Sequence, residues 1–143
     1  MYYTCLIIHV ILITINIFVA YNYCSKKYFM RIGELVKHID GKVLCCEECL
    51  DSEVVYAFAS DLMSDVLTVK CENFLLITGL SNIQAVRTAE MSDIQVIVFV
   101  RNKRVSEDMI RLARENSIVL VECSCTMFKV SGILYGLGIK AVY

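Results

Sequence analysis

Short apolar runs alternate with helical patterns through the second half of the chain. Residues 74–78 (FLLIT) and 95–100 (QVIVFV) read as strands that are apolar on both faces, as in a sheet covered on both sides. Residues 118–121 (IVLV) form a third such run. A helical pattern follows each run, and three strand–helix units in succession need right-handed crossovers. The chain therefore predicts a parallel sheet.

The residues that begin these helices are good N-caps. We expect Ser81 to cap a helix that runs to about Glu90. Ser106 is expected to cap the next helix, whose first turn carries acidic side chains that favour the helix dipole. The last helix is predicted over residues 126–135, and the glycines that follow it would end it.

The segment before residue 74 has a weaker pattern. Apolar residues at helical spacing predict a helix over residues 32–39, with Gly41 as its C-terminal stop. Residues 42–46 predict a short strand, and residues 54–58 form a second apolar run. Residues 61–67 indicate a short turn or helix with paired carboxylates.

These patterns define two parts of the chain. Residues 30–143 are expected to form one α/β domain, a small, doubly wound and mainly parallel sheet with helices on both faces. A hydrophobic segment, residues 1–29, precedes it. Asp, Glu, Lys and Arg are absent before Lys26, so all the charge lies in or next to the α/β part.

The N-terminal segment has two interpretations. Residues 2–21 are twenty uncharged residues, about the length that crosses a bilayer of roughly 30 Å. Lys26, Lys27 and Arg31 follow this run, so a transmembrane helix here would leave the C-terminus in the cytoplasm. In the other interpretation Met30 is the true start and the domain is cytoplasmic without an anchor.

Four stretches of residues 30–138 resemble a stand-alone DRTGG domain. They are MRIGELVKHIDGKVL, LDSEVVYAFASDLMSDVL, NFLLITGLSNIQAVRTAEMSDIQVIVFV and EDMIRLARENSIVLVECSCTMFKVSGILYGLG. The DRTGG string itself is not present. The resemblance implies a fold similar to the N-terminal domain of HPr kinase/phosphorylase and to domains beside CBS modules in regulatory pyrophosphatases and some phosphotransacetylases. It implies a role in assembly or regulation.

The sequence carries no catalytic signature. None of its six glycines belongs to a G-x-x-x-x-G-K-[ST] phosphate loop or to a G-x-G-x-x-G motif. Outside the hydrophobic segment the single histidine is His38, at the end of a predicted helix, where a surface role is expected. We therefore expect no enzyme and no cofactor, but a regulatory module that dimerises or docks on a partner enzyme. The net charge of −1 argues against nucleic acid as a partner.

A small phosphorylated ligand is the expected effector. In open α/β sheets ligands bind beyond the carboxyl ends of the strands. Backbone N–H groups at a helix start and nearby positive charge suit an anion such as the phosphate of a nucleotide. The alternative is that Ser81 only caps its helix and that the basic loop is solvated. The candidate residues are Thr78, Gly79, Ser81, Asn82, Arg101, Asn102 and Ser124.

Two carboxylates suggest a further ligand. Asp61 and Asp65, spaced i and i+4, could hold Mg²⁺ beside a phosphate. The alternative is that they cap a helix or face solvent.

Cysteines support a different function. Cys45, Cys46 and Cys49, with Cys123 and Cys125, would form a zinc or iron–sulfur site if the fold brought four thiolates together. The chain would then be a redox or metal-binding accessory protein. The alternative is that the thiols are reduced and pack as small apolar groups, as is usual in the cytosol.

The two-part division predicts that a chain shortened to residues 30–143 stays soluble and folds. All the expected helix caps and the whole α/β pattern lie in that range. Chemical denaturation followed by circular dichroism should give a single cooperative transition. A gradual, non-cooperative loss of signal would show that the boundary at Met30 is wrong.

Overall fold

The computed structural model describes residues 29–143, and the predictions for residues 2–21 lie outside this range. Among the described residues no helix is long and apolar enough to span a membrane. The elements in chain order are β1 (Met30–Arg31), α2 (Ile32–His38), β2 (Lys42–Cys45), the 3-10 helix η1 (Glu47–Cys49), β3 (Glu53–Val54), β4 (Tyr56–Ala59), α3 (Met63–Val66), β5 (Phe74–Thr78), α4 (Ile83–Met91), β6 (Val96–Phe99), α5 (Glu107–Glu115), β7 (Val119–Glu122), α6 (Met127–Gly136) and β8 (Lys140–Ala141).

Six strands form the main sheet, in the order β2-β7-β6-β5-β4-β8. The pairs from β7 through to β8 are all parallel, and β2 alone runs antiparallel, along β7. β1 and β3 make a separate two-stranded ladder. The prediction of a mainly parallel sheet is confirmed.

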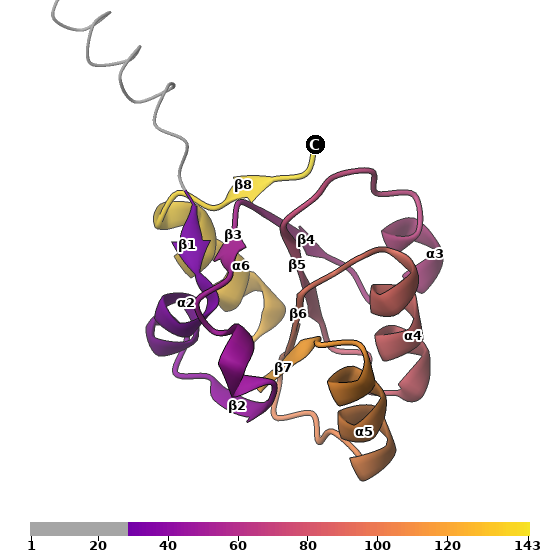
Figure 1. Ribbon diagram of the computed structural model, residues 1–143. Helices are drawn as coiled ribbons and strands as arrows, with labels where there is room; N and C mark the ends of the chain where they lie inside the picture. The colour runs from indigo at the N-terminus through magenta and orange to yellow at the C-terminus, as the bar shows by residue number, and fades with distance from the viewer. Residues whose placement is uncertain (1–28) are drawn as a thin grey trace, which may run out of the picture.

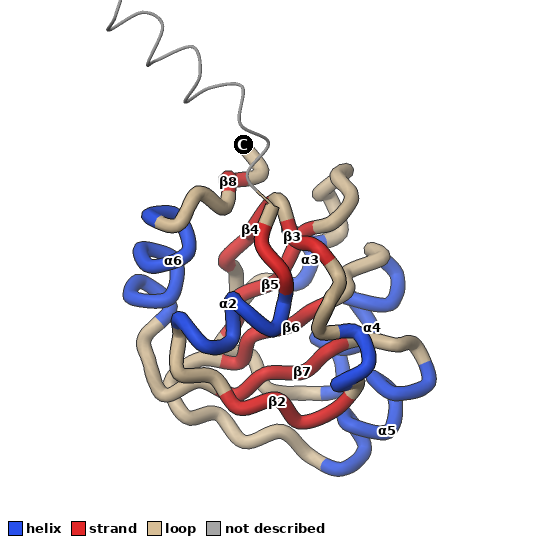
Figure 2. Tube along the Cα trace, turned by 60° about the vertical axis from the view of Figure 1, so that its left-hand side comes forward, coloured by secondary structure: helices blue, strands red, loops and turns tan. Residues whose placement is uncertain are grey.

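Helices cover both faces of this sheet (Figures 1 and 2). The chain steps from β4 to β5, β6 and β7 in one direction, and α3, α4 and α5 lie side by side on one face. From β7 it returns to β8 at the far edge, and α6 crosses the other face beside α2. The doubly wound arrangement follows from right-handed crossovers in two opposite directions.

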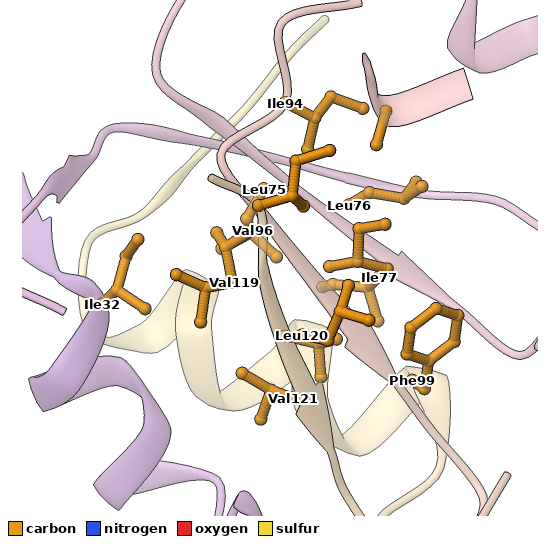
Figure 3. Close-up of a cluster of buried hydrophobic side chains, with 14 of the residues drawn as sticks. Ile32, Leu75, Leu76, Ile77, Ile94, Val96, Phe99, Val119, Leu120 and Val121 are labelled. Carbon is orange, nitrogen blue, oxygen red and sulfur yellow. The ribbon is translucent and has the colours of Figure 1, made fainter. Parts of the chain in front are cut away.

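The core lies on both faces of the three central strands (Figure 3). Every residue of β5 and β6 is buried, as are the first three residues of β7. Ile32 of α2 closes the core on one side, and Ile94 lies near the start of β6. Strands buried on both faces have to be apolar throughout, which explains why these runs were clear in the sequence.

The predicted N-cap of α4 was wrong. Asn82, not Ser81, caps α4: its side-chain oxygen accepts a hydrogen bond from the N–H of Ala85 at 3.1 Å. The Ser81 hydroxyl instead donates to the carbonyl of Arg104 in the next loop. Ser106 caps α5 as expected, through a bond from the N–H of Met109. The last helix begins one residue later than predicted, because Thr126 is its N-cap and accepts from the N–H of Lys129.

The apolar run 54–58 is not one strand. It breaks at Val55, so that Val54 pairs with Met30 in the small ladder, whereas Tyr56 pairs with Phe74 in the main sheet. Likewise, the strand predicted at 42–46 ends at Cys45, because Cys46 takes a left-handed conformation with φ 60°.

Gly41 lies at the C-terminal end of α2 as predicted, and its N–H donates to the carbonyl of Val36 at 2.9 Å. The left-handed residue after α2 is Asp40, with φ 49°, and not Gly41. A Cβ on Gly41 would lie 2.6 Å from Cγ1 of Val121 and 3.3 Å from Cγ1 of Ile39. Glycine is therefore required here for space between the start of β2 and β7.

We expect Gly41→Ala to destabilise the fold by about 1–3 kcal/mol, the usual cost of overpacking. Because the clash is with Val121, the same change should cost about 1 kcal/mol less in a Val121→Ala background. Urea denaturation of the four proteins of this double-mutant cycle measures the difference. Equal costs in both backgrounds would contradict the steric explanation.

Candidate ligand site at the carboxyl edge of the sheet

The carboxyl ends of four parallel strands meet at one edge of the sheet. Ala59 of β4 is level with Ile77 of β5, Thr78 with Phe99 of β6, and Phe99 with Glu122 of β7. The loops that follow these strands therefore lie next to one another. This is the edge at which ligands bind in open α/β sheets.

The centre of this edge is the carboxylate of Asp61. Its Oδ1 accepts hydrogen bonds from the N–H of Gly79 at 2.6 Å and from the Thr78 hydroxyl at 3.0 Å. Its Oδ2 accepts from Nη2 of Arg101 at 2.9 Å, which is also an ion pair. The carboxylate that follows β4 is thus held by donors from the ends of β5 and β6, and we call these four residues the Asp61 clamp.

Gly79 leaves room for the guanidinium of Arg101. A Cβ on Gly79 would lie only 1.6 Å from Nη2 of Arg101, so any side chain here displaces the arginine. The predicted anion-binding groups Thr78, Gly79 and Arg101 do lie together. In this structure, however, they bind a carboxylate of the chain itself.

The loop after β6 has an unusual backbone. Arg101 and Asn102 are both left-handed, with φ 63° and 53°. Their N–H groups donate to the carbonyls of Cys125 and Cys123 in the loop after β7. Adjacent left-handed residues other than glycine are costly, and such backbone is concentrated at functional sites. Here it aims the Arg101 side chain at Asp61.

The clamp favours the ionised form of Asp61. Partial burial alone would raise the pKa of this carboxyl group, since it disfavours the charged form. The hydrogen bonds from Gly79, Thr78 and Arg101, together with the arginine charge, outweigh burial. The pKa of Asp61 therefore lies below its ordinary value of 3.8.

The remaining candidate residues lie elsewhere. Ser81 and Asn82 are used in the contacts with Arg104 and Ala85 described above. Asn102 and Ser124 line a hollow of about 440 Å³ between the ends of β6 and β7, with Asp40, Lys42, Arg104, Glu122 and Cys123. The connections after β6 and β7 leave toward opposite faces of the sheet, which is where a doubly wound fold opens a crevice. Positive and negative groups are balanced in this hollow.

The geometry does not support the paired-carboxylate interpretation of Asp61 and Asp65. The i, i+4 argument needs both residues on one helix, but α3 begins only at Met63. Asp61 is bound to Gly79, whereas Asp65 is exposed on α3. His38 is exposed at the end of α2, in keeping with a surface role.

The cysteine groups are not brought together. In the antiparallel pair β2–β7, Cys45 is opposite Leu120, whereas Cys123 lies beyond Glu122 at the other end, next to Lys42. Within residues 29–143 no group of three or more His, Cys, Asp or Glu side chains is placed to hold a metal ion. The condition for the metal-binding alternative is not met in this part of the chain.

The thiols behave as packing groups. Cys45, Cys46 and Cys123 are buried and point to the backbone carbonyls of Ile118, Ala113 and Ile39. Burial, with the neighbouring Cys45, raises the pKa of Cys46 to about 12. Burial also raises the pKa of Cys71 and of Cys123. Such thiols stay protonated at neutral pH and are poor nucleophiles and metal ligands.

Sequence reasoning missed Asp61 as a member of the anion site. The signal was present: Asp61 comes three residues after the apolar run 54–58, and Gly79 and Arg101 directly follow the runs 74–78 and 95–100. The run 54–58 was not assigned to the parallel sheet, so its following loop was not placed at this edge.

Comparisons with known proteins identify a related fold. No protein-family model and no curated protein matches the chain. A structure of the CBS and DRTGG domains of the regulatory region of Clostridium perfringens pyrophosphatase, complexed with its activator diadenosine tetraphosphate, is similar with a TM-score of 0.58 and 12% identity. The likeness covers 73% of this chain and 44% of that one. At this identity it shows the fold alone.

The clamp predicts an acid-sensitive contribution of Asp61 to stability. The folded-state pKa is lowered, so the contribution is present above pH 3.8 and is lost as the pH falls through the folded pKa. Asp61→Asn cannot form the ion pair with Arg101 and should be less stable at pH 6. The difference from wild type should shrink steadily below pH 4.

Urea denaturation between pH 3 and pH 6 measures this difference. Asp108→Asn is the matched control, because it removes an exposed carboxylate that pairs with Arg111 at 2.8 Å. A constant difference between wild type and Asp61→Asn down to pH 3 would contradict the assignment.

Proposed function

We propose that this chain is a non-catalytic regulatory module that binds a small phosphorylated ligand, such as a nucleotide, at the Asp61 clamp. The effect of ligand binding is transmitted to a second copy of the chain or to a partner enzyme. The domain acts in the cytoplasm, at the membrane only if residues 2–21 anchor it.

One observation carries the ligand part of the proposal. The Gly79 N–H, the Thr78 hydroxyl and the Arg101 guanidinium already converge on a single oxyanion. Preformed donors from the ends of two neighbouring strands are what a phosphate oxygen needs, and α4 begins at Ile83, four residues after Gly79. The carboxylate of Asp61 holds the place of the ligand oxygen when no ligand is bound.

Displacement of Asp61 supplies the signal. Asp61 precedes α3, a single helical turn flanked by the exposed residues Leu62 and Leu67. A phosphate that replaces the carboxylate releases this segment from the edge of the sheet. A ligand shifts such an equilibrium only through different affinity for the two states, and competition with Asp61 provides that difference.

Two similarities support the regulatory part. The segments of residues 30–138 resemble DRTGG domains, and the C. perfringens region that shares the fold is regulatory and binds a nucleotide activator. Membership of the DRTGG family is part of this proposal. The absence of a phosphate loop from the sequence favours binding over turnover.

Thermal-shift measurements followed by calorimetry test the proposal, with inorganic phosphate, ATP and diadenosine tetraphosphate as probes. Asp61→Ala should bind at least one probe about 10–100-fold more tightly than wild type, because it removes a competing charged group worth about 1.5–3 kcal/mol. Arg101→Ala should weaken binding by a similar factor.

Two further variants sharpen the test. Gly79→Ala should weaken binding like Arg101→Ala, because its Cβ displaces the guanidinium while all charges remain. Arg111→Ala removes an arginine from the exposed pair with Asp108 on α5 and should change nothing. If no probe binds wild type or Asp61→Ala, or if Arg101→Ala binds as well as wild type, the clamp is only a structural ion pair.

A further inference from the structure

An apolar groove lies on the face of the sheet that α6 covers. It has a volume of about 460 Å³, and α6 lines it together with β4, β8 and the C-terminal residues. Phe128, Tyr135 and Tyr143 are 89%, 72% and 83% exposed, and the ring of Tyr143 packs edge-on against Phe58. Exposed aromatic side chains that gather round one groove mark an interaction surface.

The outer face of α6 carries two large aromatic side chains with a glycine between them. Phe128, Gly132 and Tyr135 are spaced i, i+4 and i+7 and so share one side of the helix. A Cβ on Gly132 would meet no atom within 4 Å, so there is open space on this side of the helix between its two aromatic side chains. In Figure 2, α6 lies at one end of the molecule, away from the other helices except α2.

This arrangement of large and small side chains is complementary to the same arrangement on a second copy. Ser131 and Gly132 lie midway between Phe128 and Tyr135, with three positions on either side. If two α6 helices cross antiparallel about a two-fold axis at Ser131 and Gly132, the small residues allow close approach. Each Phe128 then faces Tyr135 of the second copy, which gives two identical aromatic pairs.

Charge and area agree with a second copy as the occupant. Lys140 is the one charged residue in the groove lining, so a highly charged partner finds no counterpart there. Fully covered aromatic side chains bury about 150–250 Å² each, so at their exposed fractions the three rings offer roughly 350–600 Å² per copy. The floor of the groove adds to this, toward the roughly 800 Å² per partner of a stable interface.

We infer that two copies of this chain associate through their α6 faces, with the two-fold axis at Ser131 and Gly132. The inference rests on the proposed function in so far as that function names a second copy as one recipient of the signal. It identifies the surface, the symmetry and the pairing of residues across it.

Sedimentation velocity of the full chain over a range of concentrations tests this inference. Wild type should be a dimer, and Phe128→Ala should raise the dimer dissociation constant at least tenfold. Gly132→Leu should give a monomer, because the added side chain fills the hollow at the axis while the fold has room for it. Met91→Ala, an equally apolar and 73% exposed position on α4, is the control and should leave the dimer intact.

A charge exchange tests the register. Phe128→Lys alone and Tyr135→Glu alone should both be monomeric, whereas the double variant should dimerise again, because the introduced lysine faces the introduced glutamate of the other copy. A monomeric wild type overturns the inference, and so does a dimer that survives Gly132→Leu. Phosphate or nucleotide binding at the clamp is read separately by calorimetry, so failure of the dimer and failure of the proposed function are told apart.

Discussion

Burial of β5 and β6 on both faces is the constraint on which this structure depends. Every side chain of these two strands is buried, so each face of the sheet needs a covering layer. Helical crossovers provide the two layers and force the neighbouring strands to be parallel. Parallel strands end at one edge, and that edge therefore collects Asp61, Thr78, Gly79 and Arg101. The clamp is therefore a consequence of core packing.

The parts of the fold that could be predicted from sequence are those set by local chemistry. β5 was predicted at its observed bounds because a run buried on both faces is apolar throughout. Ser106 was predicted as an N-cap because its hydroxyl satisfies a backbone N–H within the same turn. Ser81 and Asn82 are both good caps, and a contact with Arg104, distant in sequence, decides between them. The break at Val55 also depends on distant partners, Met30 and Phe74.

The same division applies to the candidate site. The loops could be predicted, because each follows a clear strand. The position of the Asp61 carboxylate between these loops could not be predicted, because Asp61 and Arg101 are 40 positions apart and meet only through the strand order β4-β5-β6. The cysteines show the reverse case: their spacing suggested a shared site, yet the register of β2 on β7 places Cys45 and Cys123 at opposite ends.

The clamp and the α6 surface are joined by one continuous set of contacts. The guanidinium of Arg101 binds Asp61, while the backbone N–H of the same residue donates to the carbonyl of Cys125 at 2.9 Å. Cys125 directly precedes Thr126, the N-cap of α6. The left-handed conformation of Arg101 makes both contacts at once, so a change in the partner of its side chain acts on the same residue that holds the start of α6. The proposed regulatory role needs an element that both sites bias, and Arg101 is in contact with Asp61 and with the residue that precedes the cap of α6.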